Sequence, residues 1–355
     1  MRVVVTGATG NVGSALVRRL AADEQVDAIV GIARRRPTLQ LPRTTWQQAD
    51  VATADLRSQF EGADAVVHLA WLIQPSRDER VLQMTNVEGS ARVFEAAADA
   101  GVGALVYASS IGAYSPGPKD RAVDESWPTE GIETSFYARH KAATERILDD
   151  VEARHPELRV VRLRPGLIFQ REAATEIRRY FAGPFLPRML LRRGLIPIVP
   201  THPRLRVQAV HTDDVAEAYR LAIVTPAARG AYNVAAEPVL DGERIARLLR
   251  ARPVPVPGRV LRAAADLTWK AHLQPTPVGW VDMGLGVPIM DVTRARTELG
   301  WTPRVTAEEA LLELIDGMRE GAGYGTPPLS GATGGAGRVR EVLTGVGSRG
   351  GVEAH

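Results

Sequence analysis

The sequence predicts an α/β protein built on a doubly wound parallel β-sheet. Short β-branched runs that suit buried strands alternate with segments of helical periodicity through the first half of the chain. The opening residues, 1–13, combine a strand, a glycine-rich turn and the start of a helix. Past Pro165 the pattern turns irregular and rich in proline. A smaller region is therefore expected over the carboxyl ends of the strands.

Each element of the predicted sheet follows from a local pattern. After the first strand at Val3, Val4 and Val5, further strands are expected at residues 28–32, 45–49, 65–69, 104–108 and 160–163. Helices are expected at about 85–100, 135–153 and 213–224, and short strands at 208–210 and 231–234.

The bulk composition limits the classes of partner. The 355 residues carry 44 basic and 41 acidic side chains, a net charge of +3 that favours no nucleic-acid partner. No cysteine is present, which excludes disulfides, thiolate catalysis and cysteine metal ligands. The chain enters a strand at once and holds no apolar run of membrane-spanning length. We expect a cytoplasmic protein with no signal peptide and no membrane partner.

Three glycines at a spacing of three, Gly7, Gly10 and Gly13, follow the first strand. Glycine permits positive φ at such a turn, and a bare backbone lets a phosphate approach the N-terminus of the next helix. The pattern favours a dinucleotide site over an ordinary glycine-rich βα turn, because a strand precedes it and a helix follows.

A second group of residues suggests chemistry. Tyr137 and Lys141 are four apart and share one face of the helix expected at 135–153, and Ser110 follows the strand at 104–108. A phenol has a pKa of about 10, which a neighbouring ammonium would lower. The serine hydroxyl could then hydrogen-bond a substrate oxygen.

These motifs resemble those of the extended short-chain dehydrogenases/reductases, in the NAD-dependent epimerase/dehydratase family. The chain from Thr6 to Gly13 resembles the TGxxGxxG fingerprint, and Ser109-Ser110 followed by Tyr114 resembles the catalytic-serine motif. Further resemblances are Asp50-Val51, His68-Leu69-Ala70-Trp71, Asn86-Val87-Glu88-Gly89-Ser90, Arg164-Pro165 and Leu299-Gly300-Trp301-Thr302-Pro303.

The resemblance implies a Rossmann-type dinucleotide domain, catalysis by Ser110, Tyr137 and Lys141, and hydride transfer to or from a secondary alcohol or ketone. In the expected mechanism Tyr137 is the acid/base, and Lys141 lowers its pKa and holds the ribose. The residues implied to contact the cofactor are Gly7, Thr9, Gly10, Asn11, Val12, Gly13, Asp50, Val51, Leu69, Ala70, Trp71, Asn86, Tyr137, Lys141 and Pro165.

Two departures from the family pattern bear on the reaction. Residues 166–170 read GLIFQ where many relatives have Tyr-Gly-Pro. Ile111 and Gly112 stand where the 4,6-dehydratases carry Asp-Glu, so that dehydration is not expected. Epimerisation, net oxidation or reduction, and a non-catalytic NAD(P)-binding sensor remain as alternatives.

The end of the second strand predicts the cofactor. Residues 31–33 offer no carboxylate for a ribose 2′-OH, and Arg34 and Arg35 follow. A basic pair there suits a 2′-phosphate, so NADP(H) is favoured over NAD(H).

The substrate region leaves two interpretations open. Residues 166–206 hold eight arginines, which could clamp the pyrophosphate of a nucleotide-linked sugar or simply face solvent. The same segment carries apolar side chains, including Phe181 and Phe185, that could enclose an apolar ketone or alcohol. His68 and His211 are expected to be structural, and no metal site is expected.

We expect residues 1–165, rejoined by 207–236, to bind the dinucleotide, and residues 166–206 and 237–318 to bind a small-molecule substrate. A homodimer is compatible with the sequence. The glycine-rich residues 319–355 are expected to form a disordered tail, so that truncation after Gly325 would change neither stability nor cofactor binding.

Overall fold

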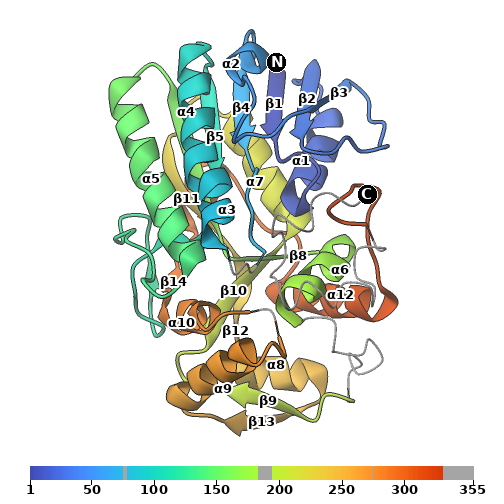
Figure 1. The fold of residues 1–355 in the computed structure, drawn as a ribbon, viewed down its shortest axis with the longest axis vertical. Coiled ribbons are helices and arrows are strands. Elements are labelled where there is room, and N and C mark those ends of the chain that lie inside the picture. Colours follow the sequence, from blue (N-terminus) through green and yellow to red (C-terminus); the bar gives the residue numbers. More distant parts are fainter. Residues whose placement is uncertain (75–77, 183–193, 275, 331–355) are drawn as a thin grey trace.

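The computed structural model describes residues 1–74, 78–182, 194–274 and 276–330 (Figure 1). A seven-stranded sheet of order β11-β7-β5-β4-β1-β2-β3 dominates it, and every pair of neighbouring strands is parallel. Its strands are β1 (Arg2–Thr6), β2 (Ala28–Ala33), β3 (Thr44–Gln48), β4 (Ala65–His68), β5 (Ala104–Ala108), β7 (Arg159–Pro165) and β11 (Gly230–Val234). The predicted doubly wound parallel sheet is confirmed.

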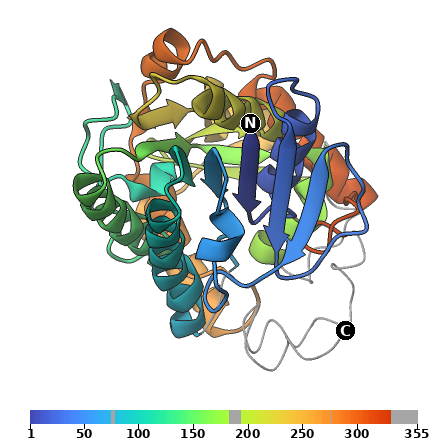
Figure 2. The same cartoon turned by 90° about the horizontal axis from the view of Figure 1, so that it is seen from above.

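Helices cover both faces of this sheet (Figures 1 and 2). Helices α1 (Asn11–Ala21) and α7 (Thr212–Val224) pack together on one face, and α4 (Gly89–Asp99) and α5 (Phe136–Arg154) pack together on the other. The short α2 (Arg57–Phe60) lies against α4. Because both faces are covered, the strands can be continuously apolar, and Val3, Val4 and Val5 are all fully buried.

The helix expected at about 85–100 begins earlier than its pattern indicates. Asp78 caps α3 (Glu79–Gln83) through the backbone N–H of Arg80, and the chain continues through a π-helical turn, η1 (Met84–Glu88), into α4. The π turn widens the helix at Asn86, a residue the resemblance places beside the cofactor.

A smaller region lies below the carboxyl edge of the main sheet in Figure 1. It contains three small sheets, which are β12-β10-β8, β13-β9 and β14-β6. Their strands are β6 (Ala122–Val123), β8 (Leu167–Phe169), β9 (Ile198–Thr201), β10 (Arg206–His211), β12 (Ala236–Asp241), β13 (Arg252–Pro255) and β14 (Ile289–Met290). Its helical segments are η2 (Ile111–Ala113), η3 (Arg171–Ala173), α6 (Ala174–Ile177), η4 (Arg178–Ala182), α8 (Gly242–Leu249), α9 (Gly258–Lys270), α10 (Gly279–Gly286), α11 (Thr293–Glu298) and α12 (Ala307–Glu320).

One expectation about this region needs correction. Residues 166–206 are not irregular throughout, because β8 pairs with β10 and β9 pairs with β13. The strand expected at 208–210 lies within β10, which pairs with β8 and β12. No helix in the described part of the chain has the length and apolar character needed to cross a bilayer.

The expected disordered tail is wrong for residues 319–330. Helix α12 continues to Glu320, and Gly321 ends it in the left-handed conformation. Residues 321–330, here called the C-terminal strap, then fold back so that Thr326 and Leu329 are 1% and 0% exposed. Composition hid this, because two side chains suffice to anchor a glycine-rich segment. Residues 331–355 lie outside the described residues.

The glycine turn allows a first test. A Cβ on Gly13 would lie 2.3 Å from the carbonyl oxygen of Gly7 and 2.8 Å from backbone atoms of Ala8, none of which can move freely. Gly13→Ala should therefore destabilise the fold by about 1–3 kcal/mol, as overpacking does. Gly10→Ala is the matched control, because its Cβ would meet only the Gly7 carbonyl oxygen, at 3.5 Å. Thermal unfolding that ranks the two variants equally would contradict this account.

Candidate active site

The turn between β1 and α1 presents backbone to an incoming ligand. Gly7 has φ +71° and lies so close to Ala70 that a Cβ would approach its nitrogen to 2.6 Å. Gly10 is the N-cap of α1 and has no side chain to cap the first helical N–H groups. Uncapped N–H groups at the positive end of a helix suit a phosphate. These residues fit the pyrophosphate of a dinucleotide.

The side chain of Asn11, at the start of α1, forms hydrogen bonds with other segments of the protein. Its Oδ1 accepts hydrogen bonds from Gln170 Nε2 at 2.7 Å and Thr212 Oγ1 at 3.1 Å. Gln170 is buried and follows β8, in the GLIFQ segment where the sequence departs from the family pattern. The segment therefore ties the glycine turn to the smaller region.

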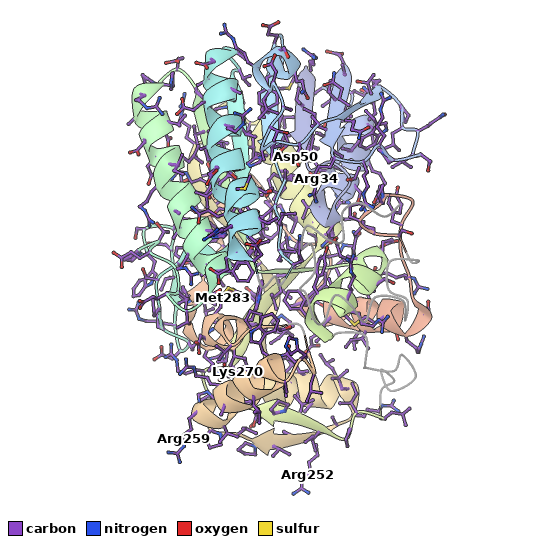
Figure 3. All side chains as sticks on the ribbon, viewed as in Figure 1. Arg34, Asp50, Arg252, Arg259, Lys270 and Met283 are labelled. Atoms are coloured by element: carbon purple, nitrogen blue, oxygen red, sulfur yellow. The ribbon has the colours of Figure 1, made fainter. Side chains whose placement is uncertain are left out.

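Next to the glycine turn, the ends of β2 and β3 form part of the carboxyl edge of the main sheet. Arg34 is exposed directly after β2, and Ala49, the residue before Asp50, donates its N–H to the Ala33 carbonyl at 3.1 Å; Figure 3 labels Arg34 and Asp50. Asp50 holds its own turn, since its carboxylate accepts from Ala52 N at 3.0 Å. Val51 is buried and contacts Gly89 closely. Arg36 turns back to donate to the Trp46 carbonyl.

Asn86 positions the chain after β4. It is fully buried, accepts a hydrogen bond from Leu72 N at 2.7 Å and donates one to Leu72 O at 2.9 Å. The clamp fixes the backbone just after Leu69, Ala70 and Trp71. Its side chain is thus engaged by protein, and it fixes the backbone of the segment that follows β4.

His68 is structural, as expected. Its two ring nitrogens pair with the hydroxyls of Thr6 at 2.7 Å and Ser90 at 2.9 Å. Burial lowers the pKa of His68 to about 3, with a smaller contribution from Lys141, so the ring is neutral at physiological pH.

Ser110 and Tyr137 meet beside the 3₁₀ turn that follows β5. Ser110 caps that turn by accepting from Gly112 N at 3.0 Å, and the Tyr137 ring packs on Gly112, where a Cβ would be 2.9 Å from it. Burial raises the pKa of Tyr137 to about 12, and a hydrogen bond with Ser110 opposes this only in part. The phenol is therefore protonated at neutral pH.

Lys141 is buried among backbone and aromatic groups. Its ammonium donates to the Ala108 carbonyl at 2.5 Å and lies 3.4 Å from the centre of the Trp71 ring and 5.9 Å from that of Tyr137. Burial lowers the pKa of Lys141 well below its ordinary value, although Glu145 opposes the shift. Its expected effect on the pKa of Tyr137 stays a prediction.

A buried ion pair holds these elements together. Arg164, at the end of β7, donates to both carboxylate oxygens of Glu145 on α5, at 2.8 Å through Nε. Ser109 donates to the same carboxylate, and Arg164 Nη1 donates to the Tyr114 hydroxyl at 3.0 Å. Burial alone would raise the pKa of Glu145, but Arg164, with Ser109 and Arg162, holds it below its usual range.

Aromatic side chains surround Tyr137. Trp280 on α10 lies 5.1 Å from the Tyr137 ring and 4.9 Å from Phe181, with Phe136 at 6.2 Å. Trp71 completes the group at 6.1 Å from Tyr137. The Met283 sulfur packs against Gly112, where a Cβ would lie 3.2 Å from it, and Figure 3 shows this residue where the two regions meet.

The described arginines of residues 166–206 mostly contact protein. Arg171 pairs with Glu320, Arg204 donates to the carbonyls of Leu285 and Gly117, and Arg206 donates to that of Lys119. Three more arginines, at 188, 192 and 193, lie outside the described residues, as does Phe185.

Sequence reasoning missed several residues of the site. Glu145, Gln170, Thr212 and Trp280 act through contacts between distant segments, for which the sequence carries no periodic signal. Glu145 alone offered a hint, because it follows Lys141 by one helical turn and so shares its face.

The chain belongs to the NAD dependent epimerase/dehydratase family, whose pattern matches residues 3–235. An uncharacterised protein of Mycobacterium tuberculosis is 30% identical over 338 residues, which are 93% of this chain and 31% of that protein. The chain thus spans about a third of the length of this curated relative.

Two further similarities cover nearly whole proteins. A 2-alkyl-3-oxoalkanoate reductase of Shewanella oneidensis is 27% identical over 343 residues, 87% of this chain and 84% of the reductase. The structure of a UDP-glucuronic acid 4-epimerase of Bacillus cereus, in complex with UDP-glucuronic acid and NAD, has a TM-score of 0.65 at 18% identity. That alignment covers 90% of this chain and 99% of the epimerase, and it shows the shared fold.

The buried ion pair gives a pH-dependent test. Because the pKa of Glu145 is depressed in the folded state, its stabilisation is present above its unfolded pKa and is lost as pH falls through the folded value. Glu145→Gln should cost about 3–5 kcal/mol near pH 7, since it leaves Arg164 buried without its partner. The cost should shrink as pH falls below about 4.5.

Thermal unfolding of both forms between pH 3 and 7 measures this difference. Glu152→Gln is the control, because Glu152 pairs with Arg162 at the more exposed side of α5 and should cost less than about 1 kcal/mol. A pH-independent gap between wild type and Glu145→Gln would contradict the assignment.

Proposed function

We propose that this protein is a nicotinamide-dependent oxidoreductase that interconverts a secondary alcohol and a ketone. The grouping of Ser110 and Tyr137 at the carboxyl edge of the sheet, beside the glycine turn, carries the proposal. The cofactor would exchange hydride at its nicotinamide ring, and the protein's own groups would handle the proton. Residues 1–165 with 207–236 would bind the dinucleotide, and 166–206 with 237–318 the substrate.

A protonated phenol can serve the reductive direction. A phenol whose pKa is raised to about 12 is a proton donor at neutral pH, which is what an alkoxide formed from a ketone requires. Ser110 would hydrogen-bond the same substrate oxygen. Lys141, near the tyrosine but not bonded to it, would contribute a ribose contact.

NADP(H) is the proposed cofactor. Residue 33, where β2 ends, is alanine, and the exposed Arg34 follows it on the same edge as Asp50. A guanidinium can bind the 2′-phosphate of NADP(H) bidentately. The ribose 2′-hydroxyl of NAD(H) needs no such cation. Arg35 is the second candidate contact. The similar epimerase structure contains NAD, so NAD(H) is the alternative that the binding test must exclude.

An apolar ketone or alcohol is the proposed substrate class. The aromatic wall around Tyr137 favours it, as does the engagement of Arg171, Arg204 and Arg206 by protein groups. The name of the Shewanella reductase denotes a ketone with alkyl chains and a carboxylate, which agrees with the alkyl part of this class. Epimerisation of a nucleotide-linked sugar is the second candidate, favoured by the fold of the similar epimerase and by the remaining arginines of 166–206.

The catalytic assignment is tested by three substitutions. Tyr137→Phe should lower turnover by about 10²–10⁴ and leave cofactor affinity intact, because it removes only the proton donor. Ser110→Ala should lower turnover while sparing cofactor affinity. Lys141→Met should lower both. Initial rates from nicotinamide absorbance with apolar ketones, and cofactor titrations, measure the pattern. Near wild-type turnover in Tyr137→Phe would refute the mechanism.

The cofactor assignment is tested by binding. Wild type should bind NADPH more tightly than NADH, and Arg34→Ala should weaken NADPH binding by about 10-fold or more while barely changing NADH binding. Arg57→Ala, on the surface of α2, is the charge-matched control. Equal affinities in wild type, or tighter binding of NADH, would overturn the preference.

A further inference from the structure

The C-terminal strap contacts the glycine turn directly. Thr326 Oγ1 donates a hydrogen bond to the Thr9 carbonyl at 2.8 Å, between residues 317 positions apart in the sequence. Both side chains are buried, with Thr326 1% and Thr9 5% exposed. Leu329, fully buried, closes a compact turn in which its N–H donates to Thr326 O and its carbonyl accepts from Tyr324 N.

The strap is also anchored on either side of this contact. Thr175 on α6 donates to the Ala322 carbonyl at 2.7 Å, so the strap begins on the smaller region. The Tyr324 ring lies 4.8 Å from the Arg18 guanidinium on α1. The strap thus joins α6 and α12 to the glycine turn and to the helix that follows it.

The bonded carbonyl belongs to the peptide whose N–H is that of Gly10. That N–H donates back to Gly7 O at 3.1 Å, and the helical N–H groups of α1 begin at the next residue, Asn11. A peptide held at both its oxygen and its nitrogen cannot rotate. Holding it fixes the direction in which the first N–H groups of α1 point.

We infer that Thr326 is a positioning residue of the dinucleotide site, and that the strap holds the glycine turn in the form that binds phosphate. The inference rests on the proposed function, because it concerns the same cofactor. Without the strap, part of the free energy of cofactor binding would be used to order the glycine turn. The affinity for the cofactor would then fall, although no direct contact to the cofactor is lost.

Thr326→Val tests the inference, because it removes the hydroxyl and keeps the shape. Losing one buried hydrogen bond should raise the Kd and KM for NADPH roughly 3- to 10-fold and leave kcat within about twofold. Amide deuterium exchange of a peptide spanning residues 7–13, measured without cofactor, should quicken. Thr297→Val is the control, since its hydroxyl bonds only within α11.

A chain ending after Gly325 serves as the second variant. It loses Thr326 and Leu329 together, so we now expect a larger rise in Kd and a lower melting temperature than for full-length protein, the reverse of the sequence-based expectation. Unchanged Kd and unchanged exchange in Thr326→Val would overturn the inference, as would a fall in kcat at constant Kd. If wild type binds neither NADPH nor NADH, the proposed function fails, and the exchange comparison still decides whether the strap orders the turn.

Discussion

The buried pair of Arg164 and Glu145 is the constraint on which the rest of the site depends. A charge removed from water must be matched by a partner in close geometry, and here the match spans β7 and α5. The same carboxylate holds Ser109 at the end of β5, and the same guanidinium holds Tyr114 after the 3₁₀ turn. Ser110 is therefore fixed against the helix that carries Tyr137 and Lys141. The ion pair thus acts on the backbone next to Ser110 without contacting Ser110 or Tyr137.

A second constraint joins the cofactor edge to the smaller region. The Asn11 side chain bonds Gln170 after β8 and Thr212 at the start of α7, and the strap bonds Thr9 from the far end of the chain. The glycine turn is thus held by side chains from three distant segments. This explains why the turn can leave its helical N–H groups uncapped without losing its shape. The main sheet and the smaller region are therefore held together at the glycine turn.

The features that the sequence predicted correctly are those that neighbouring residues determine. Buried strands were visible as β-branched runs, and the glycine spacing and the Tyr137–Lys141 interval are both set by neighbouring residues. Gln170 and Thr326 were missed because each acts across the fold on the backbone or side chain of another segment. The raised pKa of Tyr137 was not expected, because the burial that causes it is not visible in the sequence. The ordered strap was not predicted either, because its glycine-rich composition resembles that of a disordered chain.

The central claim is that hydride passes directly between the nicotinamide ring and a substrate carbon while Tyr137 supplies the proton. The most direct measurement is reduction of an apolar ketone with NADPH deuterated at C4 of the ring, followed by mass spectrometry of the alcohol. The account predicts one deuterium at the carbinol carbon when the transferred face is labelled, and loss of that product in Tyr137→Phe. A product without deuterium from either labelled face, or conversion of a nucleotide-linked sugar alone with no ketone reduced, would contradict it.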